Sequence, residues 1–257
     1  MPPAEISEPP APTLSKGLSN PYYVRQRVQP RFRDLNYLIL KDLSELLSRL
    51  AAATQGEVFD YGCGGAPYRP LFTHCKRYIA ADIQPAPTVD RVLLADGTTG
   101  EPSGSYDAVL STQVLEHIAQ PAEYLAECHR ILRPGGQLLL TTHGMFEEHG
   151  CPFDFQRWTN GGLELLASSS GFRVIESGKF TTELRAFVQL LNQMILHLRS
   201  PEKPWLHRLL AIPRKAYCVA GVPLLNWAAE IFDHQAIVPA SHPSSLYIGV
   251  YVRAIKS

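Results

Sequence analysis

Three aspartates stand at the ends of three successive apolar stretches: Asp60, Asp82 and Asp96. The first is followed at once by a glycine-rich turn that contains Gly62 and Gly64. Glycine lets the backbone approach a ligand closely, because no Cβ occupies that space. Since the carboxyl ends of parallel strands meet at one edge of a sheet, we expect these residues to line one crevice. The chemistry they suit is the binding of a nucleoside-containing cofactor.

Two cofactors compete for this crevice, a dinucleotide and S-adenosylmethionine. A dinucleotide fingerprint requires a third glycine three places after Gly64, where this chain has Pro67. The Asp60 carboxylate would repel a pyrophosphate, whereas it attracts the ammonium group of a methionine moiety directly or through water. Asp82 suits the ribose of either cofactor, and Asp96 suits an adenine amino group. The pattern therefore favours S-adenosylmethionine.

Two histidines follow strands at the expected ligand edge, His117 after the fourth stretch and His143 after the fifth. Methyl transfer is a displacement at a sulfonium-activated carbon, so alignment in a water-poor site supplies much of the catalysis. A general base is needed only where the acceptor loses a proton, as a hydroxyl does. We take His117 and His143 as candidate catalytic residues; a structural hydrogen-bonding role for His117 is the alternative.

The loop over residues 143–159 mixes imidazole, charged and aromatic groups, which suits an acceptor site with an apolar wall and a few polar anchors. Four of its residues are candidates for substrate binding: His149, Asp154, Arg157 and Trp158. In the alternative interpretation, Asp154 and Arg157 pair to brace the loop and Trp158 packs into the core. His149 and Cys151 lack a third ligand, so no metal site is predicted.

Composition indicates an ordinary folded protein of 257 residues, 45% hydrophobic and 19% charged. Lys and Arg balance Asp and Glu at 24 each, so no global field attracts nucleic acid. The five cysteines are scattered and odd in number, which argues against a disulfide framework or a zinc site. The first residues are rich in proline and lack the apolar core of a secretory signal. We expect a cytoplasmic protein.

Strands alternating with helices predict a doubly wound α/β fold with a mostly parallel, seven-stranded sheet. The expected strands are Glu57–Tyr61, Arg77–Ile83, Arg91–Leu94, Tyr106–Ser111, Gln137–Thr142, Phe172–Ser177 and Ser245–Ile255. The expected helices are Pro30–Ala53, Tyr68–His74, Pro121–Leu132 and one that Thr159 caps and that runs to Ser170.

Five parts are expected along the chain: a disordered tail over 1–20, a helical cap over 21–56, a cofactor-binding core over 57–180, a helical insertion over 181–240 and the final strand over 241–257. Helical patterns in the insertion run from Leu184 to Leu198 and lie around Trp205–Ile212 and Leu224–Phe232.

The apolar stretch Ala216–Leu225 is too short to span a bilayer and is interrupted by Pro223. It predicts no transmembrane segment. An acceptor lid or a homodimer contact is favoured for the insertion over peripheral docking on a membrane surface, because the run of basic residues near it is short.

These motifs together resemble the class I methyltransferases, particularly the type 11 small-molecule group. The resemblance covers about Glu57 to Ser177 and rests on Asp60-Tyr61-Gly62-Cys63-Gly64, Asp82, Asp96, the run Tyr106 to Ile118 and the run Leu132 to Leu138. It implies a Rossmann-like fold with S-adenosylmethionine as the cofactor. Ala66 departs from the family, which often has glycine there.

The resemblance also implies roles for single residues. Asp60, Gly62 and Gly64 would line the methionine end of the cofactor. Asp82 would hold the ribose, with Ile83 beside it as a further cofactor-binding residue. Asp96 and Gly97 would flank adenine, and Thr112 and Gln113 would sit beside the cofactor after the fourth strand.

The sequence thus predicts an S-adenosylmethionine-dependent methyltransferase that acts on a small molecule, with oxygen as the expected acceptor atom. Transfer to nitrogen or carbon is the alternative among enzymes. A non-catalytic scaffold that binds S-adenosylmethionine is the alternative of another class. Asp60 and Pro67 disfavour a nicotinamide-dependent oxidoreductase.

Overall fold

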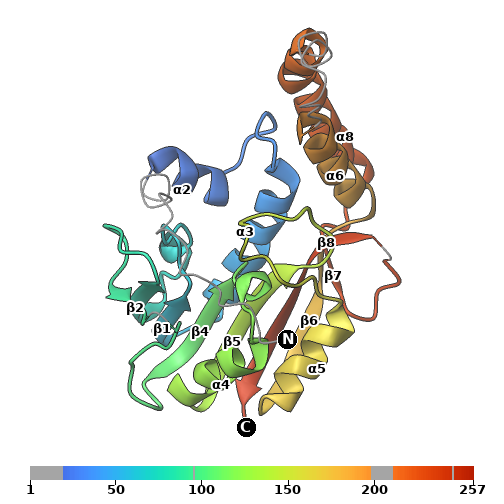
Figure 1. Cartoon of the computed structure of the whole chain (residues 1–257). Coiled ribbons are helices and arrows are strands. Elements are labelled where there is room, and N and C mark those ends of the chain that lie inside the picture. The colour runs from blue at the N-terminus through green and yellow to red at the C-terminus, as the bar shows by residue number, and fades with distance from the viewer. Residues whose placement is uncertain (1–19, 95, 198–210, 245) are drawn as a thin grey trace, which may run out of the picture.

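The computed structural model of the chain describes residues 20–94, 96–197, 211–244 and 246–257. An eight-stranded sheet with the order β3-β2-β1-β4-β5-β8-β6-β7 lies at its centre (Figure 1). The strands are β1 (Gly56–Tyr61), β2 (Cys75–Asp82), β3 (Arg91–Val92), β4 (Tyr106–Thr112), β5 (Leu132–His143), β6 (Phe172–Thr182), β7 (Ile237–Pro239) and β8 (Tyr247–Lys256). This confirms the predicted doubly wound α/β fold.

The expected number of seven strands was wrong by one. The additional strand, β7, has three residues and pairs antiparallel with Gly178–Phe180 of β6 at the edge of the sheet. A strand of this length shows no alternation of apolar and polar residues that a sequence pattern can reveal.

The sheet reverses its winding between β1 and β4. Strand β1 pairs in parallel with β2 on one side and with β4 on the other, and β5 continues the parallel order. The final alternating run forms the last strand, β8, as predicted, and the structure shows that it enters antiparallel between β5 and β6. In such sheets the crevice outside the carboxyl ends of the strands at the reversal is where ligands bind.

Alternating side chains of β1 pack against helices on opposite faces of the sheet. Val58 joins a core cluster with the leucines of α3 (Tyr37–Ala52). Phe59 joins a second cluster with residues of α4 (Pro121–Ile131) and α5 (Asn160–Ser169). The Thr159 side chain accepts a hydrogen bond from Gly162 N at 3.1 Å and caps α5, as predicted.

Two predicted helices differ from the structure. The helix expected over Tyr68–His74 is a single 3-10 turn, η1 (Arg69–Leu71), and β2 begins soon after it at Cys75. The helix expected to begin at Pro30 begins at Tyr37.

A separate short helix, α2 (Pro21–Val28), comes before α3 and was not predicted. Its N-terminus is capped by the Asn20 side chain, which accepts from Tyr22 N at 2.9 Å. The tail expected over 1–20 lies outside the described residues except for Asn20, and the helical pattern around 205–212 lies almost wholly outside them.

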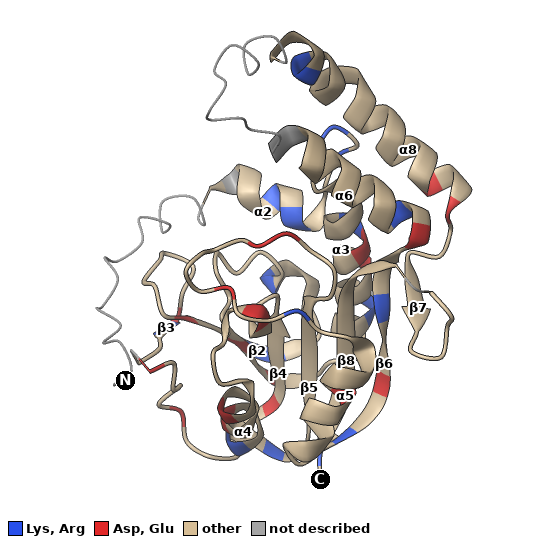
Figure 2. Ribbon diagram, turned by 45° about the vertical axis from the view of Figure 1, so that its right-hand side comes forward, with Lys and Arg blue, Asp and Glu red and all other residues tan. Residues whose placement is uncertain are grey.

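The helical insertion leaves the sheet at the carboxyl end of β6. It contains α6 (Glu183–His197), a π-helical segment η3 (Tyr217–Gly221) and α8 (Val222–Phe232). Figures 1 and 2 show α6 and α8 side by side beyond the edge of the sheet where the parallel strands end, with α2 near the same edge. Within the described ranges, no helix combines the length and the apolar character that crossing a membrane requires.

A buried ion pair fastens α6 to α3. The Arg185 guanidinium donates to both carboxylate oxygens of Asp42, with Nε at 3.0 Å from Oδ2. Thr181 Oγ1 donates to Asp42 Oδ2 at 2.8 Å. Glu230 of α8 lies 3.3 Å from the same guanidinium, so one cation links three helices at the base of the insertion.

Candidate functional site

The turn after β1 depends on a glycine at its first position. The backbone N–H groups of Gly62 and Cys63 both donate to the Ala81 carbonyl at 2.9 Å. Gly62 has a φ of +82°, and a Cβ there would lie 2.6 Å from Val114 Cγ2. Any side chain would therefore push the turn away from the segment that follows β4, so this glycine holds the ends of β1, β2 and β4 together.

Asp82 closes the same turn from β2. Its Oδ2 accepts from Gly64 N at 2.8 Å, and its Oδ1 accepts from Gln84 N at 3.1 Å. Burial raises the pKa of Asp82 above its ordinary value. Ile83 is 60% exposed beside it, which offers an apolar surface at the ligand edge.

Asp60 is the most buried acid of the three, at 2% exposure. Tyr78 of β2 donates to its Oδ2 at 2.6 Å. Burial, which outweighs the opposing effect of the Tyr78 hydrogen bond, raises the pKa of Asp60 to about 7. The carboxyl group is thus close to half ionised near neutral pH, and a nearby cation would complete its ionisation.

Asp96 and Gly97 reach the site through the loop after β3. Asp96 Oδ1 accepts from Thr98 N at 2.9 Å and from Thr98 Oγ1 at 2.7 Å, and these hydrogen bonds lower the pKa of Asp96. The Gly97 carbonyl accepts from the hydroxyl of Tyr61 at the end of β1. The loop is therefore tied to the edge where Asp60 and Asp82 lie.

Thr112 and Gln113 bring unsatisfied polar atoms to the end of β4. Gln113 has a φ of +55°, and its N–H donates to the Thr141 carbonyl at 3.0 Å. Thr112 Oγ1 and Gln113 Oε1 are buried and have no hydrogen-bond partner among the described residues. Burying such atoms without a partner is costly, so a bound ligand is expected to satisfy them.

A second group of residues lies beyond β4 and β5 and centres on His143. Nε2 of His143 is 3.3 Å from Oε1 of Glu116, which belongs to the 3-10 turn η2 (Leu115–His117). The His143 ring stacks on Phe146 at 4.1 Å and meets the edge of His149 at 5.0 Å. Burial lowers the pKa of His143 well below its usual value, so its imidazole is neutral.

His117 lies on the open side of this group. Its Nδ1 is 2.6 Å from the Phe153 carbonyl, and its ring is 4.8 Å from that of His149. Because a carbonyl only accepts, Nδ1 carries the proton and Nε2 of the neutral ring has the lone pair. The structure thus brings His117, His143 and His149 together at the ligand edge.

Asp154 and Arg157 pair with each other, as the alternative interpretation proposed. Two hydrogen bonds of 2.6 Å join the guanidinium to the carboxylate, and Asp154 Oδ2 also accepts from His149 N at 2.7 Å. The Asp154 side chain is 1% exposed, so it holds the loop and does not reach an acceptor directly. Trp158 packs against the core cluster that contains Phe59, although its indole N–H has no partner within the described part of the chain.

Sequence reasoning did not select Glu116 as a site residue. The carboxylate is wholly buried, and Thr142 Oγ1 donates to its Oε2 at 2.9 Å. The available signal was an acid in an otherwise mostly apolar run at a strand end, Val114 to Ile118. A buried acid in such a run needs a hydrogen-bond partner. Thr142 of β5, which lies 26 residues further along the chain, supplies it.

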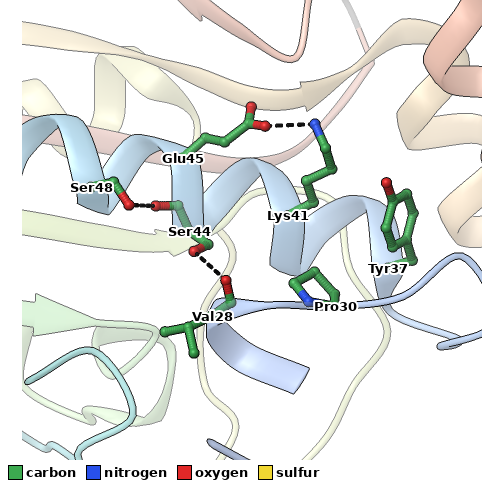
Figure 3. A pocket seen from close by; sticks show the side chains of 7 residues that line it. All are labelled: Val28, Pro30, Tyr37, Lys41, Ser44, Glu45 and Ser48. Carbon is green, nitrogen blue, oxygen red and sulfur yellow. Dashed lines mark hydrogen bonds and ion pairs between the residues drawn. The ribbon is translucent and has the colours of Figure 1, made fainter. Parts of the chain in front are cut away.

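A surface hollow along α3 is separate from this edge (Figure 3). Its polar groups satisfy one another: Lys41 Nζ lies 2.6 Å from Glu45 Oε1, and Ser44 Oγ donates to the Val28 carbonyl at 3.2 Å. It therefore offers less to a ligand than the carboxyl edge. The residues that line it are Val28, Pro30, Tyr37, Lys41, Ser44, Glu45 and Ser48.

Comparison with known proteins agrees with this geometry. The family model described as a methyltransferase domain matches residues 59–140, which include the β1 turn, the three acids and the β4 end. An S-adenosylmethionine-dependent methyltransferase from Mycolicibacterium smegmatis is 31% identical over 128 residues, 46% of this chain and 49% of that protein. Residues 59–140 of the chain therefore carry a methyltransferase domain of the class I S-adenosylmethionine-dependent type.

A further curated enzyme and a solved structure are also similar to this chain. A ubiquinone biosynthesis O-methyltransferase from Pseudomonas aeruginosa is 28% identical over 129 residues, 43% of this chain and 56% of that enzyme. The chain spans about half the length of these curated relatives. The solved structure of the cyclase SpnF superposes with a TM-score of 0.52 at 17% identity and covers 97% of this chain and 99% of its own, which shows the shared fold alone.

The residues of the methyltransferase domain fit S-adenosylmethionine. Asp60 stands one residue before the end of β1, Asp82 ends β2, and the exposed Ile83 provides an apolar contact for a base. Thr112 Oγ1 and Gln113 Oε1, which have no hydrogen-bond partner among the described residues, are available to contact the cofactor. A dinucleotide fits less well, because Asp60 lies buried in the turn where a pyrophosphate would bind.

Proposed function

We propose that this protein transfers a methyl group from S-adenosylmethionine to a hydroxyl oxygen of a small molecule. The observation that carries the proposal is the position of the imidazole group of His117, His143 and His149 at the same carboxyl edge as the cofactor-binding acids. The Pseudomonas relative that methylates oxygen supports the choice of acceptor atom. Transfer to nitrogen or carbon remains the rival reaction.

The cofactor would lie across the ends of β1, β2 and β4. Asp60, with Gly62 and Gly64, would face the methionine moiety, and Asp82 would accept from the ribose hydroxyls. Ile83, Asp96 and Gly97 would flank adenine. Thr112 Oγ1 and Gln113 Oε1, which lack partners among the described residues, would form hydrogen bonds with the cofactor. When bound, the cofactor supplies an electrophilic methyl carbon.

His117 is the proposed general base. With the cofactor bound, the hydroxyl proton of the acceptor would pass to Nε2 of His117 as the acceptor oxygen took the methyl group from the cofactor. The Phe153 carbonyl holds the ring in the tautomer that this step requires. His143 and Phe146 would form the wall against which the acceptor is aligned, and Asp154 and Arg157 would position the loop that carries His149.

The decisive experiment is calorimetric titration of the full chain with S-adenosylmethionine and, in parallel, with NAD. Saturable binding of S-adenosylmethionine alone supports the proposal. Binding of NAD alone would overturn it. The protein with bound cofactor is then incubated with a panel of phenols and amines. Formation of S-adenosylhomocysteine distinguishes an enzyme from a non-catalytic scaffold, and the methylated products identify the acceptor atom.

The insertion carries the proposed interaction surface. Five of its large apolar side chains are 49–75% exposed: Phe187, Met194, Leu224, Trp227 and Phe232. This supports a role as an acceptor lid or a homodimer contact. Light scattering of the purified protein distinguishes the two roles, because a homodimer has twice the mass of a single chain. All five cysteines are free, which suits the proposed reducing, cytoplasmic location.

A further inference from the structure

Three side chains from separate segments converge beside the proposed acceptor pocket. Glu116 comes from η2, His143 ends β5, and His149 lies in the loop that follows. Each offers one ligand atom, and these three atoms all lie within 4.8 Å of one another. Two imidazoles and one carboxylate are a common donor set for divalent transition metals.

The spacing of two of these atoms suits a shared cation better than a direct hydrogen bond. Glu116 Oε1 and His143 Nε2 are 3.3 Å apart, whereas a charge-assisted hydrogen bond measures about 2.7–2.9 Å. Two ligands of a tetrahedral ion with bonds of about 2.0–2.1 Å lie about 3.3 Å apart. Glu116 Oε1 is also buried with no hydrogen-bond partner in the described part of the chain.

Outer contacts orient Glu116 and His149 as a metal site requires, whereas Nδ1 of His143 is buried with no hydrogen-bond partner in the described part of the chain. The second oxygen of Glu116 accepts from Thr142 Oγ1 at 2.9 Å, which leaves Oε1 for a cation. His149 Nδ1 is 3.2 Å from the Glu147 carbonyl, and His149 N donates to Asp154. Metal-bound histidines usually donate their other ring N–H to a carbonyl or carboxylate in this way, which leaves His149 Nε2 free to coordinate.

The nearby positive charges do not rule out a cation. Arg157 is paired with Asp154 through both of its terminal nitrogens. Arg27 of α2 lies over the ring of Tyr23 at 4.9 Å, although its charge also reaches Glu116. A buried carboxylate beside neutral imidazoles remains the group that a divalent ion would contact first.

We propose that Glu116, His143 and His149 bind one divalent transition-metal ion, with a coordination position left open toward the acceptor. Cys151, the one cysteine of this loop, is exposed and does not belong to the cluster. Resting on the proposed methyl transfer, the ion would hold the acceptor oxygen and lower the pKa of its hydroxyl, which eases loss of the proton to His117.

The test is calorimetric titration of chelator-treated full-length protein with Zn²⁺, followed by titration with Co²⁺ while visible absorption is recorded. We expect one ion per chain. His149→Ala and Glu116→Gln should each weaken Zn²⁺ binding at least tenfold, whereas His234→Ala, which removes an exposed histidine after α8, should leave it unchanged. His149 is only half buried, so its variant is expected to keep the fold.

Absence of stoichiometric Zn²⁺ binding would overturn the proposed site. Equal Zn²⁺ affinity in the His149→Ala and His234→Ala variants would also overturn it, because the ion would then bind elsewhere on the surface. Each variant is also titrated with S-adenosylmethionine. A protein that binds the cofactor but no metal refutes the metal site alone. A protein that binds metal but no cofactor leaves the site in place and refutes the proposed methyl transfer.

Discussion

The N–H of Gly64 donates a 2.8 Å hydrogen bond to Oδ2 of Asp82, so the acid proposed to hold the ribose also holds the turn that would receive the methionine moiety. One carboxylate thus couples the ends of β1 and β2. The two proposed halves of the cofactor site cannot be altered separately at this residue.

Asp82→Ala should therefore weaken S-adenosylmethionine binding at least tenfold, since hydrogen bonds to charged groups contribute about 1.5–3 kcal/mol each. Asp82→Asn keeps an oxygen for Gly64 N but loses the carboxylate, and we expect an intermediate loss. Calorimetry measures both. Glu123→Ala, which removes an exposed acid of α4, is the control. Undiminished affinity in Asp82→Ala would discard the ribose assignment.

The affinity for S-adenosylmethionine should rise with pH through the pKa of Asp60. Burial raises that pKa from 3.8 to about 7, so the free protein carries a protonated Asp60 at pH 6 and an ionised one at pH 8. Only the ionised form attracts the cofactor ammonium. For a pKa near 7 the ionised fraction, and with it the affinity, rises about tenfold between pH 6 and pH 8.

Asp60→Asn provides the control for this pH dependence. The variant should bind weakly and with little change in affinity over the same range, because no carboxyl group titrates there. If the wild-type affinity were flat between pH 6 and pH 8, Asp60 would not contact the charged end of the cofactor.

Ala66 stands at a φ of +49°, which explains why the family often has glycine at this position. Ala66→Gly should change the free energy of unfolding by less than about 0.8 kcal/mol in either direction. The relief of about 1–2 kcal/mol of left-handed strain offsets the lost methyl group, about 0.8 kcal/mol, and the added chain entropy, about 0.4–1 kcal/mol.

Ala80→Gly is the matched comparison for Ala66→Gly. Ala80 is fully buried in β2, in the same small cluster as Ala66, but has no left-handed strain to relieve. Its substitution should cost at least about 1 kcal/mol. Urea unfolding measures both variants, and an equal cost at the two positions would contradict the strain argument.

The position of the proposed cofactor-binding residues at one edge of the sheet was predictable, because these residues lie at or just after strand ends. Asp82 and Thr112 end their strands and Asp60 stands one residue before the end of β1, so the strand prediction placed all three at one edge of the sheet. Glu116 was missed because its partner His143 lies on the next strand, and only the folded sheet shows that both are buried. Pairing between Asp154 and Arg157 was one of two interpretations, since spacing alone does not say whether such residues contact a ligand or each other.

The insertion was harder to predict, because its attachment depends on contacts between distant helices. Asp42 and Arg185 are 143 residues apart, and both are almost fully buried. Burial raises the pKa of Asp42 to about 6 in spite of the adjacent guanidinium. A strongly desolvated acid of this kind depends on its partner, which leads to the last prediction.

Arg185→Ala should lower the free energy of unfolding by about 3–5 kcal/mol, because it leaves the Asp42 carboxyl buried without its cation. The matched control is Arg49→Ala. Arg49 lies 2.6 Å from Glu176 but is 50% exposed, so its loss should cost less than about 1 kcal/mol. Adding Asp42→Asn to Arg185→Ala should restore part of the stability, since it removes the buried charge. Equal costs for the two arginines in urea unfolding would show that the buried pair does not fasten α6 to the core.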